Sequence, residues 1–133
     1  MLKLVDALIT EDIDYLHASL HEVLVARPLD DSALLVAQQL ISHVGGRVPL
    51  MAAGSLRTPE QALGLGLSMV AIGKGLVMNQ DWVELAKSGS ADAIRQTLDA
   101  ERRIELEIPE GLWRAVEASP GWIPVSRGEG NLG

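Results

Sequence analysis

The sequence contains no cysteine and no phenylalanine, and its aromatic residues are three tryptophans and one tyrosine among 133 residues. Without cysteine there can be no disulfide, no thiolate nucleophile and no sulfur-ligated metal. Basic residues are also few: 11 Lys and Arg stand against 18 Asp and Glu, and no basic cluster interrupts the net charge of −7. We therefore expect no binding to nucleic acid or to anionic membranes, and the reducing cytoplasm as the location.

Long hydrophobic runs are absent as well. Charged residues or glycines interrupt every apolar stretch well before the roughly 20 residues that a membrane helix needs. A signal-like leader is also missing, which again favours the cytoplasm. The hydrophobic content of 47% is too high for a disordered chain, so the composition predicts a folded domain with an aliphatic core.

Helix and strand patterns alternate along most of the chain. Apolar residues recur at helical spacing in some segments, whereas others are short, continuous and rich in strand formers. This alternation predicts an α/β fold with parallel strands that are covered on both faces. We expect strands over residues 13–19, 47–53 and 68–72, and helices over residues 2–11, 34–44, 59–64 and 80–87, with further helical turns in 91–98.

Several residues have the chemistry of helix ends. Thr58 precedes a proline and stands three residues before a glutamine, which is a strong helix-start signal. Asp30 or Asp31 is expected to cap the second helix and Asn79 the fourth, because their short polar side chains accept hydrogen bonds from helix N–H groups. Gly45 is expected to stop the second helix.

The C-terminal part differs from the rest. Residues 101–107 are rich in charge and suggest a solvated helix face, and residues 109–118 suggest a short helix. Because aromatic residues are scarce, we expect Trp82, Trp113 and Trp122 to pack this tail against the helices. The expected organisation is a main domain over residues 1–98, a helical extension over 99–125 and a disordered tail over 126–133.

Two glycine-bearing turns are the candidate ligand site, since each directly follows a predicted strand. Gly54 and Ser55 follow the second strand, and Gly73 and Lys74 follow the third. Ligands of parallel α/β proteins gather at the carboxyl ends of strands, where glycine lets backbone N–H groups approach an anion and lysine adds a charge. An alternative interpretation is that these glycines only permit tight turns.

Other sites are less well supported by the sequence. A P-loop is excluded because Gly75, and not Ser or Thr, follows Lys74, and no dinucleotide-binding glycine motif opens a helix after a strand. His17 and His21 lack a third ligand, so we expect no metal site. His43 is expected to complement the end of its helix.

Ordered motifs surround the two turns and continue into the tail. They are Val48 to Ser55, Thr58 to Ala62, Val70 to Leu76, Asn79 to Val83, Ile108 to Trp113 and Pro120 to Trp122. Together they closely resemble the end of the Old Yellow Enzyme family, whose members are NADH:flavin oxidoreductases built on an FMN-binding (β/α)₈ barrel. Residues 14–19 are similar to the sixth strand of that barrel, and the tail is similar to one bacterial branch of the family.

The resemblance implies a fold, a cofactor and site residues. It implies a partial TIM barrel of three parallel strands, barrel strands six to eight, with flanking helices and a helical C-terminal tail. It assigns Gly54, Ser55, Gly73 and Lys74 to the phosphate of FMN. The family more often has Arg in place of Lys74, so the positive charge is kept and the planar fork of donors is not.

The resemblance also implies what this chain does not contribute. A complete barrel takes about 250 residues, and the family places the residues that hold the flavin ring and activate the substrate on earlier strands. We therefore assign no catalytic residue and expect the chain to be inactive by itself. FMN and NADH are expected as partners of the full-length enzyme, with FMN absent from this chain or weakly bound to it.

A further expectation follows from the three-stranded sheet. Its outer strands leave backbone groups unpaired, which predicts self-association, most simply as a homodimer. The alternative function is a noncatalytic module that binds a phosphorylated molecule or serves in assembly.

Overall fold

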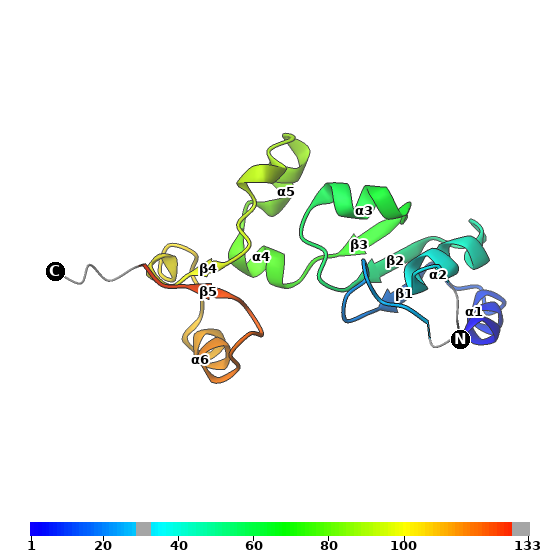
Figure 1. Ribbon diagram of the computed structural model, residues 1–133, viewed down its shortest axis with the longest axis horizontal. Helices are drawn as coiled ribbons and strands as arrows, with labels where there is room; N and C mark the ends of the chain where they lie inside the picture. The colour runs from blue at the N-terminus through cyan, green and yellow to red at the C-terminus, as the bar shows by residue number, and fades with distance from the viewer. Residues whose placement is uncertain (29–32, 129–133) are drawn as a thin grey trace. The chain divides into compact units, whose positions relative to one another are not determined.

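The computed structural model describes residues 1–28 and 33–128 of the chain, which divides into two compact units, Met1–Ile72 and Gly73–Gly133. The expected main domain ended at residue 98, where the structure has the short strand β4 (Leu98–Asp99). Each unit has its own parallel sheet, of three strands in the first and of two in the second (Figure 1). The predicted α/β class is therefore confirmed.

Helices and strands alternate in the first unit as the sequence predicts. The strands pair in the order β1-β2-β3, all parallel, and are shorter than the predicted segments. The elements are α1 (Leu2–Ile9), β1 (Leu16–Ser19), α2 (Val36–Val44), β2 (Leu50–Ala53), α3 (Pro59–Leu65) and β3 (Met69–Ala71).

The three-stranded sheet has one covered face and one open face. On the covered face Leu16 lies beside Leu50, and Ala52 lies between Ala18 and Val70. These side chains pack into two hydrophobic clusters. Residues of the opposite face belong to neither cluster, as far as the described residues go, and we call them the open sheet face: His17, Ser19, Met51, Ala53, Met69 and Ala71. On this face His17 and Ser19 are exposed and the other four residues are half-buried, so covering of the strands on both faces stays a prediction.

The core of the first unit joins α1, α2 and β2. Val5 of α1 packs with one face of α2 and with Leu50 of β2. Each fully buried aliphatic side chain of this kind contributes about 1.5–3 kcal/mol of transfer free energy. The α2 side chains in the cluster are Val36, Leu40 and Val44.

A polar contact also joins α1 to the end of α2. The Asp6 carboxylate lies 2.9 Å from His43 Nε2 and accepts a hydrogen bond of 2.9 Å from Arg47 Nη2. The hydrogen bond from Arg47, followed by that from His43, lowers the pKa of Asp6 below its usual range. His43 lies in the last turn of α2, as the sequence predicted, and its ring also pairs with a carboxylate of another helix.

Helix ends agree with the sequence where local chemistry decides them. Thr58 caps α3 in a capping box with Gln61. Gly45 ends α2 and Gly66 ends α3, both in the left-handed conformation that glycine adopts at low cost. α2 begins at Val36, two residues later than predicted, and the proposed caps Asp30 and Asp31 lie outside the described residues.

The second unit is built from short elements around one hydrophobic cluster. Its elements are α4 (Lys74–Met78), α5 (Trp82–Lys87), the 3₁₀ turns η1 (Ala91–Ala93) and η2 (Ala100–Arg102), α6 (Glu110–Ala118), and the paired strands β4 and β5 (Val125–Ser126). The cluster comprises Met78, Leu98, Leu106, Trp113, Val116 and Ile123.

Several predictions for the second unit are wrong. Residues 91–98 hold one 3₁₀ turn and a strand residue, not further α-helix, and the charged segment 101–107 is a 3₁₀ turn followed by turns. Trp113 and Trp82 are buried as expected, but Trp122 is 42% exposed. The predicted helix of the tail is α6. Ser126 lies in β5, and residues 129–133 lie outside the described residues.

Candidate functional site

The carboxyl ends of β2 and β3 lie side by side in the first unit. Ala53 at the end of β2 is in register with Ala71 at the end of β3. Gly54 follows β2 directly, and Gly73 stands two residues after β3 as the first residue of the second unit. The four predicted residues therefore form two separate turns, which we call the Gly54 turn and the Gly73 turn.

The Gly54 turn contacts the backbone of the loop that follows β1. Gly54 has a φ of 143°, and a Cβ atom added there would stand 2.2 Å from the carbonyl oxygen of Leu20. Two hydrogen bonds hold the same contact: Leu20 N–H donates to Ala53 O at 2.9 Å, and Val23 N–H donates to Gly54 O at 3.0 Å. Packing alone thus requires glycine at position 54, because any larger residue would collide with backbone.

Ser55 takes part in the same contact. Its hydroxyl donates to the carbonyl oxygen of His21 at 3.2 Å, and its φ of 53° lies in the left-handed region. No described residue accepts a hydrogen bond from the Ser55 backbone N–H. Ser55 therefore has its backbone donor available for an anion, whereas its hydroxyl already has a partner.

The Gly73 turn opens a short helix that the sequence did not predict. Gly73 is the N-cap of α4 and Lys74 is the first helical residue, exposed to solvent. Apart from its neighbours in the chain, a Cβ at Gly73 would meet no atom of residues 1–28 and 33–128 within 4 Å. Among the described residues, no acceptor receives the N–H groups of Lys74 and Gly75, and Lys74 forms no ion pair. Free N–H groups of a first helical turn, with a lysine charge beside them, favour an anion.

Asn79 is a further residue of this region whose place the sequence did not predict. It ends α4 and does not cap α5, which begins at Trp82 after Asp81. Among the described residues, Asn79 is the one polar residue that is buried, and it has no exposed surface. Its side chain bonds the backbone at Gly75 and at Arg95. The sequence offers no signal for this role, because Arg95 is 16 residues away.

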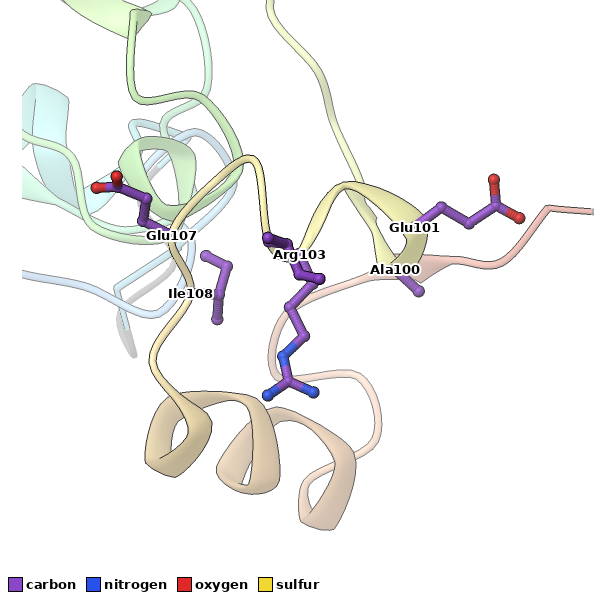
Figure 2. Close-up of a pocket in the computed structure, with 6 residues that line it drawn as sticks. Ala100, Glu101, Arg103, Glu107 and Ile108 are labelled. Atoms are coloured by element: carbon purple, nitrogen blue, oxygen red, sulfur yellow. The ribbon is translucent and has the colours of Figure 1, made fainter.

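A surface hollow of about 560 Å³ lies elsewhere in the second unit. Figure 2 shows that the side chains of Glu101 and Glu107 point in different directions and that Arg103 extends toward α6. Arg103 pairs there with Glu110 and lies over the ring of Trp113. This hollow contains none of the four predicted residues, and its carboxylates are not arranged as a pair for acid-base chemistry.

Metal binding and membrane insertion are two other possibilities that the structure addresses. Within residues 1–28 and 33–128, no three His, Asp or Glu side chains are close enough together to hold a metal ion. In the same ranges, no helix has the length and apolar character required to span a bilayer.

Comparison with known proteins found three relatives and no matching protein-family model. The chain is 34% identical over 125 residues to the probable NADH-dependent flavin oxidoreductase YqiG of Bacillus subtilis (strain 168), which covers 91% of this chain and 34% of that protein. It is 29% identical over 121 residues to the NADH:acrylate oxidoreductase of Vibrio harveyi, covering 86% of this chain and 12% of that protein.

The third relative is the NADH:fumarate oxidoreductase of Klebsiella pneumoniae (strain 342). The chain is 29% identical to it over 118 residues, which are 84% of this chain and 12% of that protein. The chain thus spans about a third of the length of the first relative and about an eighth of the other two.

Proposed function

The chain belongs to the Old Yellow Enzyme type of NADH-dependent flavin oxidoreductases, and we propose that its two glycine turns bind the phosphate of FMN. Gly54 and Ser55 would contribute from the end of β2, and Gly73 and Lys74 from the start of α4. The names of the relatives support a flavin and NADH as partners. FMN in particular, and the use of NADH by the whole protein, are part of the proposal.

The observation that carries the proposal is the Gly73 turn. Packing leaves the position of a Cβ at Gly73 empty, so sterics do not explain the glycine there. The turn presents backbone N–H groups that have no acceptor among the described residues, next to an exposed lysine. These donors fit a phosphate, because a dianion gains both from hydrogen bonds and from positive charge.

The proposed contribution of each residue differs. Lys74 would neutralise phosphate charge, and the N–H groups of Lys74 and Gly75 would donate to phosphate oxygens. Ser55 would donate through its backbone N–H, since its hydroxyl donates to His21. Gly54 would serve indirectly, by allowing the close approach to Leu20 that shapes the turn.

We also propose that β1, β2 and β3 are strands six to eight of a (β/α)₈ barrel. The open sheet face supports this, because the inner face of barrel strands packs against the other strands of the closed barrel. FMN would supply the hydride chemistry when bound, with Ser55, Lys74 and the Gly73 turn holding its phosphate and Gly54 shaping the neighbouring turn. The residues that activate a substrate would belong to other strands, so we assign no catalytic residue and propose that this chain alone is inactive.

Comparison of FMN with riboflavin tests the proposal, because the two ligands differ only in the phosphate. We expect the chain to bind FMN about tenfold or more tightly than riboflavin, as charge-assisted hydrogen bonds contribute about 1.5–3 kcal/mol. Lys74→Ala should weaken FMN binding about tenfold and leave riboflavin binding unchanged. Flavin fluorescence titration measures both affinities.

Lys87→Ala is the matched control for this experiment. Lys87 is an exposed lysine of the same unit and pairs only loosely with Glu84, at 3.9 Å. The control should bind FMN as the parent chain does. Equal affinities of the parent chain for FMN and riboflavin would refute the phosphate site, and FMN-dependent NADH oxidation by the chain would refute its inactivity.

The noncatalytic alternative is favoured by one observation, the open sheet face. A sheet face of this kind on an isolated chain needs a cover, and we propose that a second copy provides it. Self-association together with equal affinities for FMN and riboflavin would describe an assembly module.

A further inference from the structure

The side chain of Asn79 makes three hydrogen bonds inside the second unit. Its Nδ2 donates to Gly75 O at 3.1 Å and to Arg95 O at 3.0 Å, and its Oδ1 accepts from Arg95 N–H at 2.8 Å. Both donor hydrogens and the acceptor of the amide are therefore used. The side chain has no exposed surface, so water does not compete for these partners.

The Arg95 contact has the chemistry of strand pairing. A primary amide carries one acceptor and two donors, so it bonds both backbone groups of Arg95 as a neighbouring strand would. The remaining Nδ2 hydrogen goes to Gly75 O, which also accepts the Asn79 backbone N–H at 3.0 Å. One side chain thus joins the first turn of α4 to the segment that leads into β4.

This junction decides how α4 is held. A helix of five residues has little stability of its own in water. Its last residue, Met78, is buried in the hydrophobic cluster of the second unit. The other fixed point is the carbonyl of Gly75, which follows Lys74 directly in the sequence. Without the Asn79 side chain, the carbonyl of Gly75 would keep only the Asn79 backbone N–H as its partner, and the link from the first turn of α4 to Arg95 would be lost.

We propose that Asn79 is the positioning residue of the Gly73 turn: it holds the carbonyl of Gly75 and thereby keeps the N–H groups of α4 and Lys74 in the arrangement that binds phosphate. This inference rests on the proposed function. Asn79 does not touch the phosphate itself, because its polar atoms are all occupied by backbone. Its effect passes through Gly75 to the adjacent Lys74.

The test is the ratio of the FMN affinity to the riboflavin affinity in variants of the full chain. Asn79→Asp keeps the side-chain shape but replaces the Nδ2 donor with an oxygen that faces the carbonyls of Gly75 and Arg95. We expect it to lower the ratio about tenfold, since both carbonyls lose a buried partner. Asn79→Ser retains a donor and should lower the ratio less, about threefold.

Val116→Ala separates positioning from general stability. Val116 is a buried residue of the same cluster on α6, so its truncation loosens the second unit without removing a hydrogen bond of α4. We expect this control to keep the parent ratio at temperatures where the chain stays folded, as followed by circular dichroism. If Asn79→Asp does not fold, Asn79→Ser against Val116→Ala decides the question.

Two failures are distinguishable in this design. A parent chain that prefers FMN, together with Asn79 variants that keep the full preference, overturns the positioning role and leaves the phosphate site intact. A parent chain that binds FMN and riboflavin equally overturns the phosphate site, and the role of Asn79 with it.

Discussion

The Gly54 turn and the Gly73 turn share the same pattern in the sequence and have different physical causes. At Gly54 the backbone of Leu20 approaches so closely that a Cβ would stand 2.2 Å from its carbonyl oxygen. At Gly73 no atom lies within 4 Å of the same position, and φ is −108°. The fold requires the first glycine and does not require the second.

This difference bears on how glycines after strands are interpreted. A glycine that packing already explains says little about a ligand, because the protein needs it with or without one. A glycine in open space has no such explanation, and a close approach by another molecule is a reason to have it. The Gly73 turn therefore contributes more to the proposed function than the Gly54 turn.

The sharpest test of this comparison replaces each glycine with alanine. Gly54→Ala should destabilise the chain by about 3 kcal/mol, because the new methyl group collides with backbone and φ is unfavourable for alanine. Gly73→Ala should change the free energy of unfolding by less than about 0.5 kcal/mol, since it adds no contact. Urea unfolding followed by circular dichroism measures both. Equal effects of the two substitutions would contradict the distinction.

The open sheet face belongs to the first unit, and self-association tests its proposed role. Light scattering coupled to size-exclusion chromatography should find the parent chain as a dimer at micromolar concentration. Met51→Lys places a charge on the open sheet face of the first unit and should weaken the dimer about tenfold or more. Ala115→Lys, at an exposed position of α6 in the second unit, is the control. A parent chain that is monomeric would refute this expectation.

The smallest expected effect concerns acid stability in the first unit. Since Arg47 and His43 lower the pKa of Asp6, its contribution is complete above the ordinary aspartate pKa and is lost as the pH falls through the lowered value. Asp6→Asn should therefore lose less stability than the parent chain between about pH 5 and pH 2. Urea midpoints across this range measure it, with Asp14→Asn, another exposed aspartate, as control. The effect is small because the groups are solvated.

Local chemistry made part of the fold predictable. The cap at Thr58 and the end of α2 at Gly45 depend on residues within four positions of each other, so the sequence states them directly. The order of helices and strands in the first unit follows from apolar periodicity in the same way. The candidate turns were found because they follow predicted strands.

Long-range contacts explain what the sequence did not reveal. The pairing of His43 with Asp6 spans 37 residues, and that of Asn79 with Arg95 spans 16. α4 was missed because its five residues include Gly75, a poor helix former, and because the contacts that hold it are distant in sequence. Trp122 was expected to be buried because aromatic residues are scarce, but its exposure depends on how the tail folds, which composition does not determine.

The bonds between Asn79 and Arg95 have a consequence for the chain between them. Residues 80–94, which contain α5 and η1, form a long loop, and the side chain of Asn79 joins the two ends of this loop. The length of this loop does not affect α4 and β4, the elements on either side of it. Residues inserted at the exposed Gly89 would lengthen this loop and leave the positions of α4 and β4 unchanged. We therefore expect the second unit to tolerate added sequence at this position.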